Sequence, residues 1–237
     1  VIYWGLEATA AKRYDLGAGG AQDKVVLSEL LRFGTSYWAI VALCVVFYSA
    51  VFPFQTFAVK FFMEAHGTTR EHGGFLSSIL TLFAMIATPL FGLAADRFGR
   101  RATLMVWGSF LMIPAYLLMA YTSVSLYVPM ALMGTAFSLI PAVMWPSVAY
   151  IVGQERLGTA YGLMTMVQNI GLAAFNLAIG WANDAWGASA ANPGGYVPGM
   201  WIFTGLGIMG VLMSLFLLRH ERGPGAHGLE TITTHSR

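Results

Sequence analysis

Six long apolar runs, separated by short polar segments, constrain the fold of this chain more than any other feature of its sequence. A helix needs about 20 mostly apolar residues to cross a bilayer, and each run is close to that length or longer. Strands of a transmembrane barrel would instead give segments of about ten residues with alternating polarity. The sequence therefore predicts an all-α, polytopic membrane protein with six helices, at residues 38–62, 75–95, 102–121, 126–152, 160–182 and 200–218.

The composition supports a membrane protein and argues against other classes. Hydrophobic residues make up 57% of the chain and charged residues only 10%, which lies far from the usage of soluble domains. A nucleic-acid surface needs cations gathered on one folded face, whereas the cations here are spread over the segments between the runs. We therefore expect no nucleic-acid partner. The single cysteine, Cys44, lies inside the first run, so no disulfide can form within the chain.

The distribution of lysine and arginine predicts the orientation in the membrane. Of 13 such residues, 11 fall in segments on one side of the six runs, and only Lys60 and Arg70 fall on the other. The positive-inside rule places the richer side in the cytoplasm, so both termini are predicted to be cytoplasmic. The 11 residues are Lys12, Arg13, Lys24, Arg32, Arg97, Arg100, Arg101, Arg156, Arg219, Arg222 and Arg237.

Composition also divides the chain into three parts. Residues 1–36 mix charged residues with glycine and resemble an interior linker, so we predict a cytoplasmic linker between two halves of a longer protein. Residues 37–218 hold the six apolar runs and form the predicted membrane unit. Residues 219–237 are short and rich in glycine, and they predict a disordered cytoplasmic tail.

The segment between the second and third runs is the most distinctive motif, with four charges and two glycines in ten residues. It reads Gly92-Leu93-Ala94-Ala95-Asp96-Arg97-Phe98-Gly99-Arg100-Arg101. Asp96 ends one helix at a point from which its carboxylate can reach the N-terminus of a neighbouring helix, whose dipole favours negative charge. We expect Gly92 to permit close helix approach, Gly99 to permit a sharp turn, and the three arginines to lie at the lipid head groups. An alternative is that the loop only anchors the topology.

The spacing G-x-x-x-D-R-x-G-R-R in this segment resembles the cytoplasmic loop between the second and third helices of each half of the major facilitator superfamily. A second segment, Gln154–Gly162, resembles the loop that enters the fifth helix of such a half. The resemblance implies the carboxyl-terminal half of a twelve-helix transporter with alternating access, whose partner is an amino-terminal six-helix half. It also implies that the first loop gates conformational change. The residues assigned to this loop are Gly92, Asp96, Arg97, Gly99, Arg100 and Arg101.

Three further stretches, Phe47–Phe54, Met144–Tyr150 and Gln168–Ala173, together resemble the lysosomal dipeptide uniporter branch of that superfamily. This resemblance implies facilitated export of small peptides, often with cationic side chains. The membrane would be lysosomal in a eukaryotic member of the branch and the cell membrane in a microbial relative. An accessory membrane subunit is a further candidate partner, and no cofactor is expected.

Polar and aromatic residues inside the runs are candidates for contact with a solute. In the fourth run Gly134, Ser138, Pro141 and Trp145 follow one another by steps of four, three and four, so they share a helical face. Trp145 offers an indole N–H and a broad aromatic surface to a peptide. Packing between helices is the alternative role for such side chains. The predicted substrate-binding residues are Tyr48, Gln55, Ser138, Trp145 and Asn169.

The runs contain no aspartate, glutamate, histidine or arginine, and Lys60 lies near the outer end of the first. This pattern favours uniport over proton symport, although a coupling carboxylate could lie in the other half. A proton-coupled or exchange transporter of another organic solute, such as a sugar or an organic anion, stays open. So does a six-helix channel or scaffold subunit that transports nothing.

An enzyme is not expected, because an intramembrane hydrolase needs a nucleophile together with a histidine or carboxylate at membrane depth. All five histidines lie outside the runs. We therefore assign no catalytic residue, no metal site and no cofactor.

Overall fold

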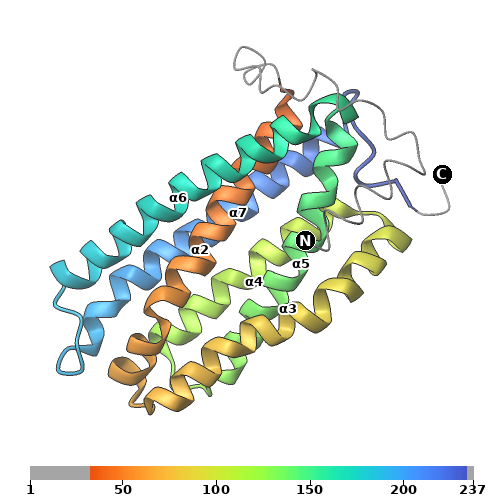
Figure 1. Cartoon of the computed structure of the whole chain (residues 1–237). Coiled ribbons are helices and arrows are strands. Elements are labelled where there is room, and N and C mark those ends of the chain that lie inside the picture. Colours follow the sequence, from red (N-terminus) through yellow and green to blue (C-terminus); the bar gives the residue numbers. More distant parts are fainter. Residues whose placement is uncertain (1–32, 234–237) are drawn as a thin grey trace, which may run out of the picture.

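The computed structural model describes residues 33–233, which form a bundle of six long helices (Figure 1). All six are long and apolar enough to cross a membrane, so the predicted all-α class with six spans is confirmed. The predicted linker 1–36 lies outside the described residues except for its last four. The helices are α2 (Thr35–His66), α3 (Arg70–Phe98), α4 (Arg101–Tyr121), α5 (Tyr127–Ile151), α6 (Leu157–Ala185) and α7 (Val197–His220), and the short 3-10 helices are η3 (Gln154–Arg156) and η4 (Pro193–Tyr196).

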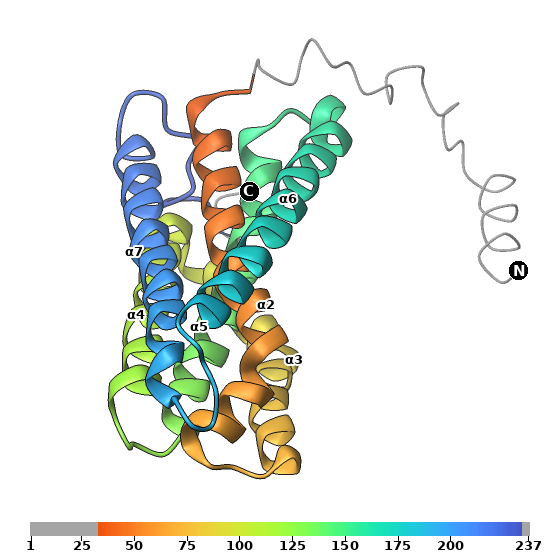
Figure 2. The ribbon, with the colours of Figure 1, turned by 90° about the vertical axis from the view of Figure 1, so that its left-hand side faces the viewer.

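The helices pack in an order that leaves two of them at the edges. Helix α2 lies in the middle and contacts α6, α7 and α3, while α4 packs between α7 and α5, and α5 packs against α3. Figure 2 shows α3 and α6 on one side of α2, with α4 and α7 on the other. The edge helices α3 and α6 consequently have faces that no described helix covers.

Aromatic side chains and backbone hydrogen bonds join the central helices. The hydroxyl of Tyr116 on α4 donates to the carbonyl oxygen of Ala50 on α2 at 2.7 Å, and its ring stacks on Phe203 of α7 at 5.1 Å. The hydroxyl of Tyr37 on α2 donates to the carbonyl oxygen of Ala160 on α6 at 2.8 Å. These buried hydroxyls meet their hydrogen-bonding needs inside the bundle, as polar groups away from water must.

The helix boundaries follow from local chemistry. Helix α2 ends at His66, and the next residue, Gly67, has a positive φ of 64° that turns the chain so that the Thr68 N–H donates to the carbonyl oxygen of Phe62 at 3.2 Å. Glycine adopts this conformation without steric cost. Helix α3 begins after Thr69, whose hydroxyl accepts a hydrogen bond from the His72 N–H at 3.2 Å. The threonine thus caps one of the free N–H groups of the first turn.

The segment after α7 packs against the bundle. Composition predicted a disordered tail over 219–237, but residues 221–233 turn back across the end of the bundle where α3 and α4 meet (Figure 1). Leu229 is fully buried and Glu221 is almost so. The apolar and charged side chains of this short segment find partners on distant helices, which a local composition cannot reveal. We call this end of the bundle the loop end and the opposite one the far end.

Candidate functional site

An aromatic cluster joins α2, α5 and α6 in the half of the bundle nearer the loop end. The indole N–H of Trp145 donates to the hydroxyl oxygen of Tyr48 at 2.8 Å. Tyr161 stacks on the Trp145 ring at 5.9 Å, and its hydroxyl donates to the Trp145 carbonyl oxygen at 3.0 Å. Phe52 stacks on Tyr48 at 5.5 Å and meets Phe137 edge to face at 5.9 Å. The structure thus brings two of the predicted substrate-binding residues, Tyr48 and Trp145, into direct contact.

The cluster runs from the core to the surface of the described bundle. Tyr48 is buried, Trp145 is half-buried, and Phe52 keeps 37% of its surface exposed. Helix α6 continues this surface with Thr165 and Asn169, which are both exposed. An accessible face therefore combines the rings of Phe52 and Trp145 with the Thr165 hydroxyl and the Asn169 amide, which are groups that can contact a polar solute.

The other predicted substrate-binding residues take different places: Ser138 lies in the core, Gln55 is half-buried, and Asn169 is on the accessible surface. Ser138 is fully buried, and its hydroxyl donates to the carbonyl oxygen of Gly134 one turn earlier at 2.8 Å. A Cβ on Gly134 would come within 2.9 Å of Phe83 on α3, so this part of α5 packs against α3. Gln55 is half-buried two turns beyond Tyr48, and the Asn169 side-chain amide donates to the Thr165 carbonyl oxygen at 2.8 Å.

Three members of the cluster, Phe52, Phe137 and Tyr161, are not among the residues predicted from the sequence. Phe52 and Tyr161 fall within Phe47–Phe54 and Gln154–Gly162, two stretches that carry the family resemblance, so the sequence does contain a signal for both. Phe137 is an apolar residue in an apolar run and carries no comparable signal. Its place beside Phe52 depends on how α5 packs against α2, which periodicity within one helix does not determine.

A polar pair lies deeper, in the contact between α2 and α6. The Cys44 thiol donates to the Gln168 side-chain oxygen at 3.3 Å, and both residues are buried. The helices approach closely there, because a Cβ on Gly171 would lie 2.6 Å from the Val45 side chain. Cys44 therefore acts in helix packing, in agreement with a structural role for a buried thiol.

The loop that the motif predicts to gate adopts a turn built from two residues with positive φ, Gly99 at 67° and Arg100 at 55°. The Asp96 carboxylate pairs with the Arg101 guanidinium at 2.6 Å, at the first residue of α4. The guanidinium also lies 4.8 Å above the ring of Tyr150 on α5. The predicted loop residues thus connect α3, α4 and α5 at the loop end.

Two expectations for this loop need correction. Arg101 was expected at the lipid head groups, but only 2% of its surface is exposed, because Asp96, Tyr150 and the segment after α7 surround it. Arg97 and Arg100 are exposed, as expected for residues at a membrane surface. A Cβ on Gly92 would meet nothing within 4 Å, so no described helix makes the close approach that this glycine was expected to permit.

Two cavities lie at the ends of the bundle, away from the aromatic cluster. The far-end cavity has a volume of about 640 Å³, and its lining includes Phe61, His66, Met119, Tyr121, Pro193 and Tyr196. The loop-end cavity has a volume of about 410 Å³, and its lining includes Phe33, Val152, Gln154, Glu155, Arg156 and His227. Neither lining contains a predicted substrate-binding residue. Within residues 33–233 no group of three potential metal ligands comes together.

Comparisons with known proteins agree with the motif and the helix pattern. The family described as Major Facilitator Superfamily matches residues 39–234. The lysosomal dipeptide transporter MFSD1 of Danio rerio is 31% identical over 182 residues, which cover 77% of this chain and 40% of the relative. The proteins of the same name from Gallus gallus and Homo sapiens are each 30% identical, and the matches cover 77% and 71% of this chain and 41% and 36% of those relatives. The chain thus spans about two fifths of the length of the curated relatives it matches.

Proposed function

The chain belongs to the major facilitator superfamily, and we propose that it supplies one six-helix half of a membrane transporter that moves small solutes by alternating access. The proposed cargo is a dipeptide, because the relatives are named lysosomal dipeptide transporters. The proposed mode is uniport, since the central parts of the described helices carry no charged residue that could relay protons.

The uncovered faces of α3 and α6 support a second half. In the most apolar part of each helix, 72% of residues are buried for α2 but only 11% for α3 and 22% for α6. Lipid could cover apolar side chains there. It would cover Thr165 and Asn169 poorly, because polar side chains inside a membrane generally face protein or a water-filled path. We infer that a second set of six helices lies opposite this side of the bundle.

The observation that carries the proposal is the hydrogen-bonded pair of Trp145 and Tyr48 on the same side, with exposed Phe52 beside it. The aromatic surfaces of half-buried Trp145 and exposed Phe52 can contact a peptide amide or a cationic side chain, and the buried Tyr48 hydroxyl holds the indole in place. The amino and carboxylate groups of a dipeptide need charged partners, which we assign to the second half. The pair would then form one wall of a site between two halves.

The chain is a membrane protein, whereas its orientation and the membrane in which it lies are proposals. The family and the six apolar helices make this an integral, multi-pass membrane protein. We propose a cytoplasmic loop end from the concentration of arginine there, and a lysosomal or cell membrane according to the kind of organism. The gating role of Asp96 and its neighbours in the loop is part of the same proposal.

Uptake into proteoliposomes tests the proposed function. The full-length protein is reconstituted and offered labelled dipeptides, a free amino acid, a sugar and an organic anion, with and without a pH gradient. We expect saturable dipeptide uptake that does not depend on the proton gradient beyond the effect of substrate charge. Uptake of another solute alone, or strict dependence on the gradient, would contradict the dipeptide uniporter, and the absence of any uptake would contradict transport.

Substitution of Trp145 tests the proposed wall of the site. A cation–π contact contributes about 0.5–2 kcal/mol, so we expect Trp145→Ala to raise the half-saturating dipeptide concentration by roughly two- to thirtyfold. Trp145→Phe keeps a ring but loses the N–H, so its half-saturating concentration should lie between those of the parent protein and Trp145→Ala. The matched control is Trp201→Ala, since Trp201 is exposed near the far end and donates to Tyr121. An unchanged half-saturating concentration in Trp145→Ala would return this residue to a packing role.

A further inference from the structure

The segment Glu221–Ile232, which we call the strap, links three helix ends at the loop end. It leaves α7, passes the start of α2 and finishes beside the α3–α4 turn. Figure 1 draws it as the blue segment next to the end of α3. Its buried residues are Glu221 at one end and Leu229 near the other. The strap is therefore attached at both ends.

The first attachment is centred on the Glu221 carboxylate. This carboxylate accepts hydrogen bonds from the Ser36 hydroxyl at 2.8 Å, from the His227 N–H at 2.8 Å and from the Leu229 N–H at 3.3 Å. Burial alone would raise the pKa of the Glu221 carboxyl, but these bonds and the contact with the His227 ring bring the pKa below its ordinary value. The ionised carboxylate thus holds the strap to the first turn of α2 at neutral pH.

The second attachment is to the gating loop. The N–H of Arg101 donates to the Leu229 carbonyl oxygen at 2.9 Å, and the N–H of Arg100 donates to the Glu230 carbonyl oxygen at 3.2 Å. The Arg101 guanidinium also donates to the Ile232 carbonyl oxygen at 2.7 Å. The strap therefore supplies acceptors to the backbone of the turn and to the arginine that pairs with Asp96.

Glu230 also caps α4 from outside that helix. Its carboxylate accepts from the Thr103 N–H at 2.9 Å and from the Thr103 hydroxyl at 2.7 Å. The local cap residue, Arg100, makes no side-chain capping bond. A carboxylate at this place satisfies a free N–H and complements the positive end of the helix dipole. A residue 127 positions away in sequence thus does what an N-cap residue usually does.

The turn is shaped to admit the strap. A Cβ on Gly99 would lie 3.0 Å from the Glu230 carbonyl oxygen, so a larger side chain would press on the strap backbone. Gly99 also has a positive φ, which a side chain would strain. The missing side chain and the positive φ of Gly99 therefore both allow the strap to lie against the turn.

We propose that the strap regulates transport by holding the gating loop in one arrangement, with Glu230 as the positioning residue. This inference rests on the proposed function, because a loop can gate only in a protein that transports. Bound, the strap fixes the turn relative to the ends of α2 and α7. Released, it frees the N-terminus of α4 and lets the Asp96–Arg101 pair rearrange.

Hydrogen exchange and uptake on the full-length protein test this proposal together. A hydrogen bond to a charged group is strong enough that its loss should speed exchange about tenfold, so we expect this increase in a peptide covering residues 99–104 of Glu230→Ala. Glu230→Gln keeps one acceptor oxygen, so its exchange rate in this peptide should lie between those of the parent protein and Glu230→Ala. We expect the maximal uptake rate of Glu230→Ala to differ at least about twofold from that of the parent, with the half-saturating concentration unchanged. The control is Glu155→Ala, which removes an exposed carboxylate from the same end.

Each other result has a definite meaning. Unchanged exchange in both Glu230 variants would overturn the strap contact itself. Faster exchange with an unchanged uptake rate would overturn the regulatory role and leave a structural cap. If the parent protein moves no solute, the proposed function fails, while the exchange result still decides whether Glu230 holds the loop.

Discussion

Replacement of Arg101 with alanine is expected to lower uptake by the full-length protein by at least about tenfold. The guanidinium is nearly fully buried and joins Asp96, the Ile232 carbonyl oxygen and the face of Tyr150. A hydrogen bond to a charged group contributes about 1.5–3 kcal/mol. The guanidinium makes two of them, and the one to half-exposed Asp96 is weakened by solvent. A loss of about 2 kcal/mol from the loop shifts its conformational balance more than tenfold.

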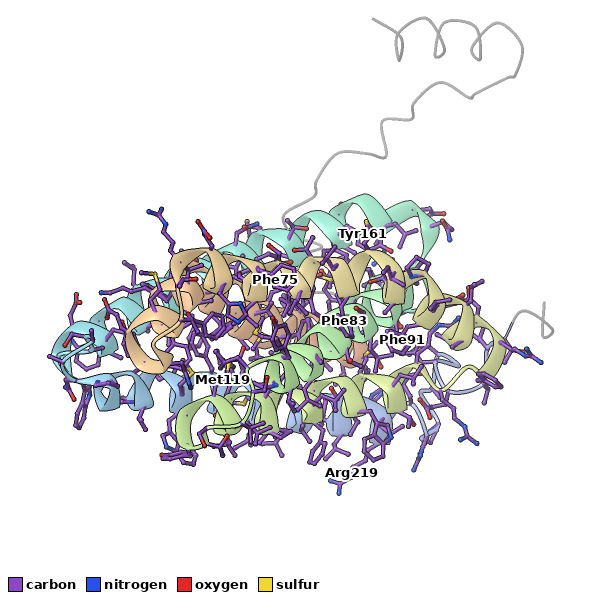
Figure 3. All side chains as sticks on the ribbon, turned by 90° about the horizontal axis from the view of Figure 1, so that it is seen from below. Phe75, Phe83, Phe91, Met119, Tyr161 and Arg219 are labelled. Atoms are coloured by element: carbon purple, nitrogen blue, oxygen red, sulfur yellow. The ribbon has the colours of Figure 1, made fainter. Side chains whose placement is uncertain are left out.

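Related variants should form a graded series. Asp96→Asn removes only the charge of a side chain that is 52% exposed, so solvent screening should limit its effect to about 1 kcal/mol, or about fivefold in uptake. Arg101→Lys should not restore the parent rate, since an ammonium cannot present the same planar fork to two partners. Arg219→Ala is the control, because Arg219 is exposed and points away from the bundle in Figure 3.

The measurement is initial uptake per reconstituted molecule, together with the melting temperature in detergent. A rate for Arg101→Ala equal to that of Arg219→Ala, in protein that is folded and inserted, would remove Arg101 from the proposed gating loop. If the rate falls only in step with the amount of folded protein, the arginine serves stability alone.

The helices were predictable because the bilayer fixes the length of an apolar run. Their ends were less so: the first run covers 38–62, whereas α2 extends over Thr35–His66. The helix continues past its apolar part until Gly67 provides a residue suited to positive φ. Hydrophobic length therefore predicts that a helix exists, and capping residues decide where it stops.

The candidate site was predictable only in part. Helical spacing placed Trp145 and Ser138 on one face of α5, but Ser138 is fully buried and donates to its own helix, whereas Trp145 donates to Tyr48 on α2. Spacing ranks residues along one helix, while the neighbour of each residue depends on tertiary packing. Arg101 illustrates the same limit, since the strap that buries it follows α7, about 130 residues later in the chain.

Close contact between α4 and α5 leads to the second large expected effect, the loss of stability in Gly108→Ala and Gly108→Leu. A Cβ on Gly108 would lie 2.5 Å from Cγ1 of Ile140, and Ile140 is itself fully buried. Neither helix can yield without disturbing α7 or α3, which pack on their other sides. We expect Gly108→Ala to cost about 1–3 kcal/mol, and Gly108→Leu to prevent stable folding.

The control is Gly205→Ala, which should not lower the stability of the protein. Gly205 lies on the exposed face of α7, where a Cβ would meet nothing within 4 Å. Alanine is a better helix former than glycine by roughly 0.5–1 kcal/mol, so Gly205→Ala should leave stability unchanged or raise it slightly. Thermal unfolding of the full-length variants in detergent provides the comparison. Equal melting temperatures for Gly108→Ala and Gly205→Ala would mean that α4 and α5 are not in close contact at this point. Because that contact positions α5, the packing that places Trp145 beside Tyr48 would then need revision.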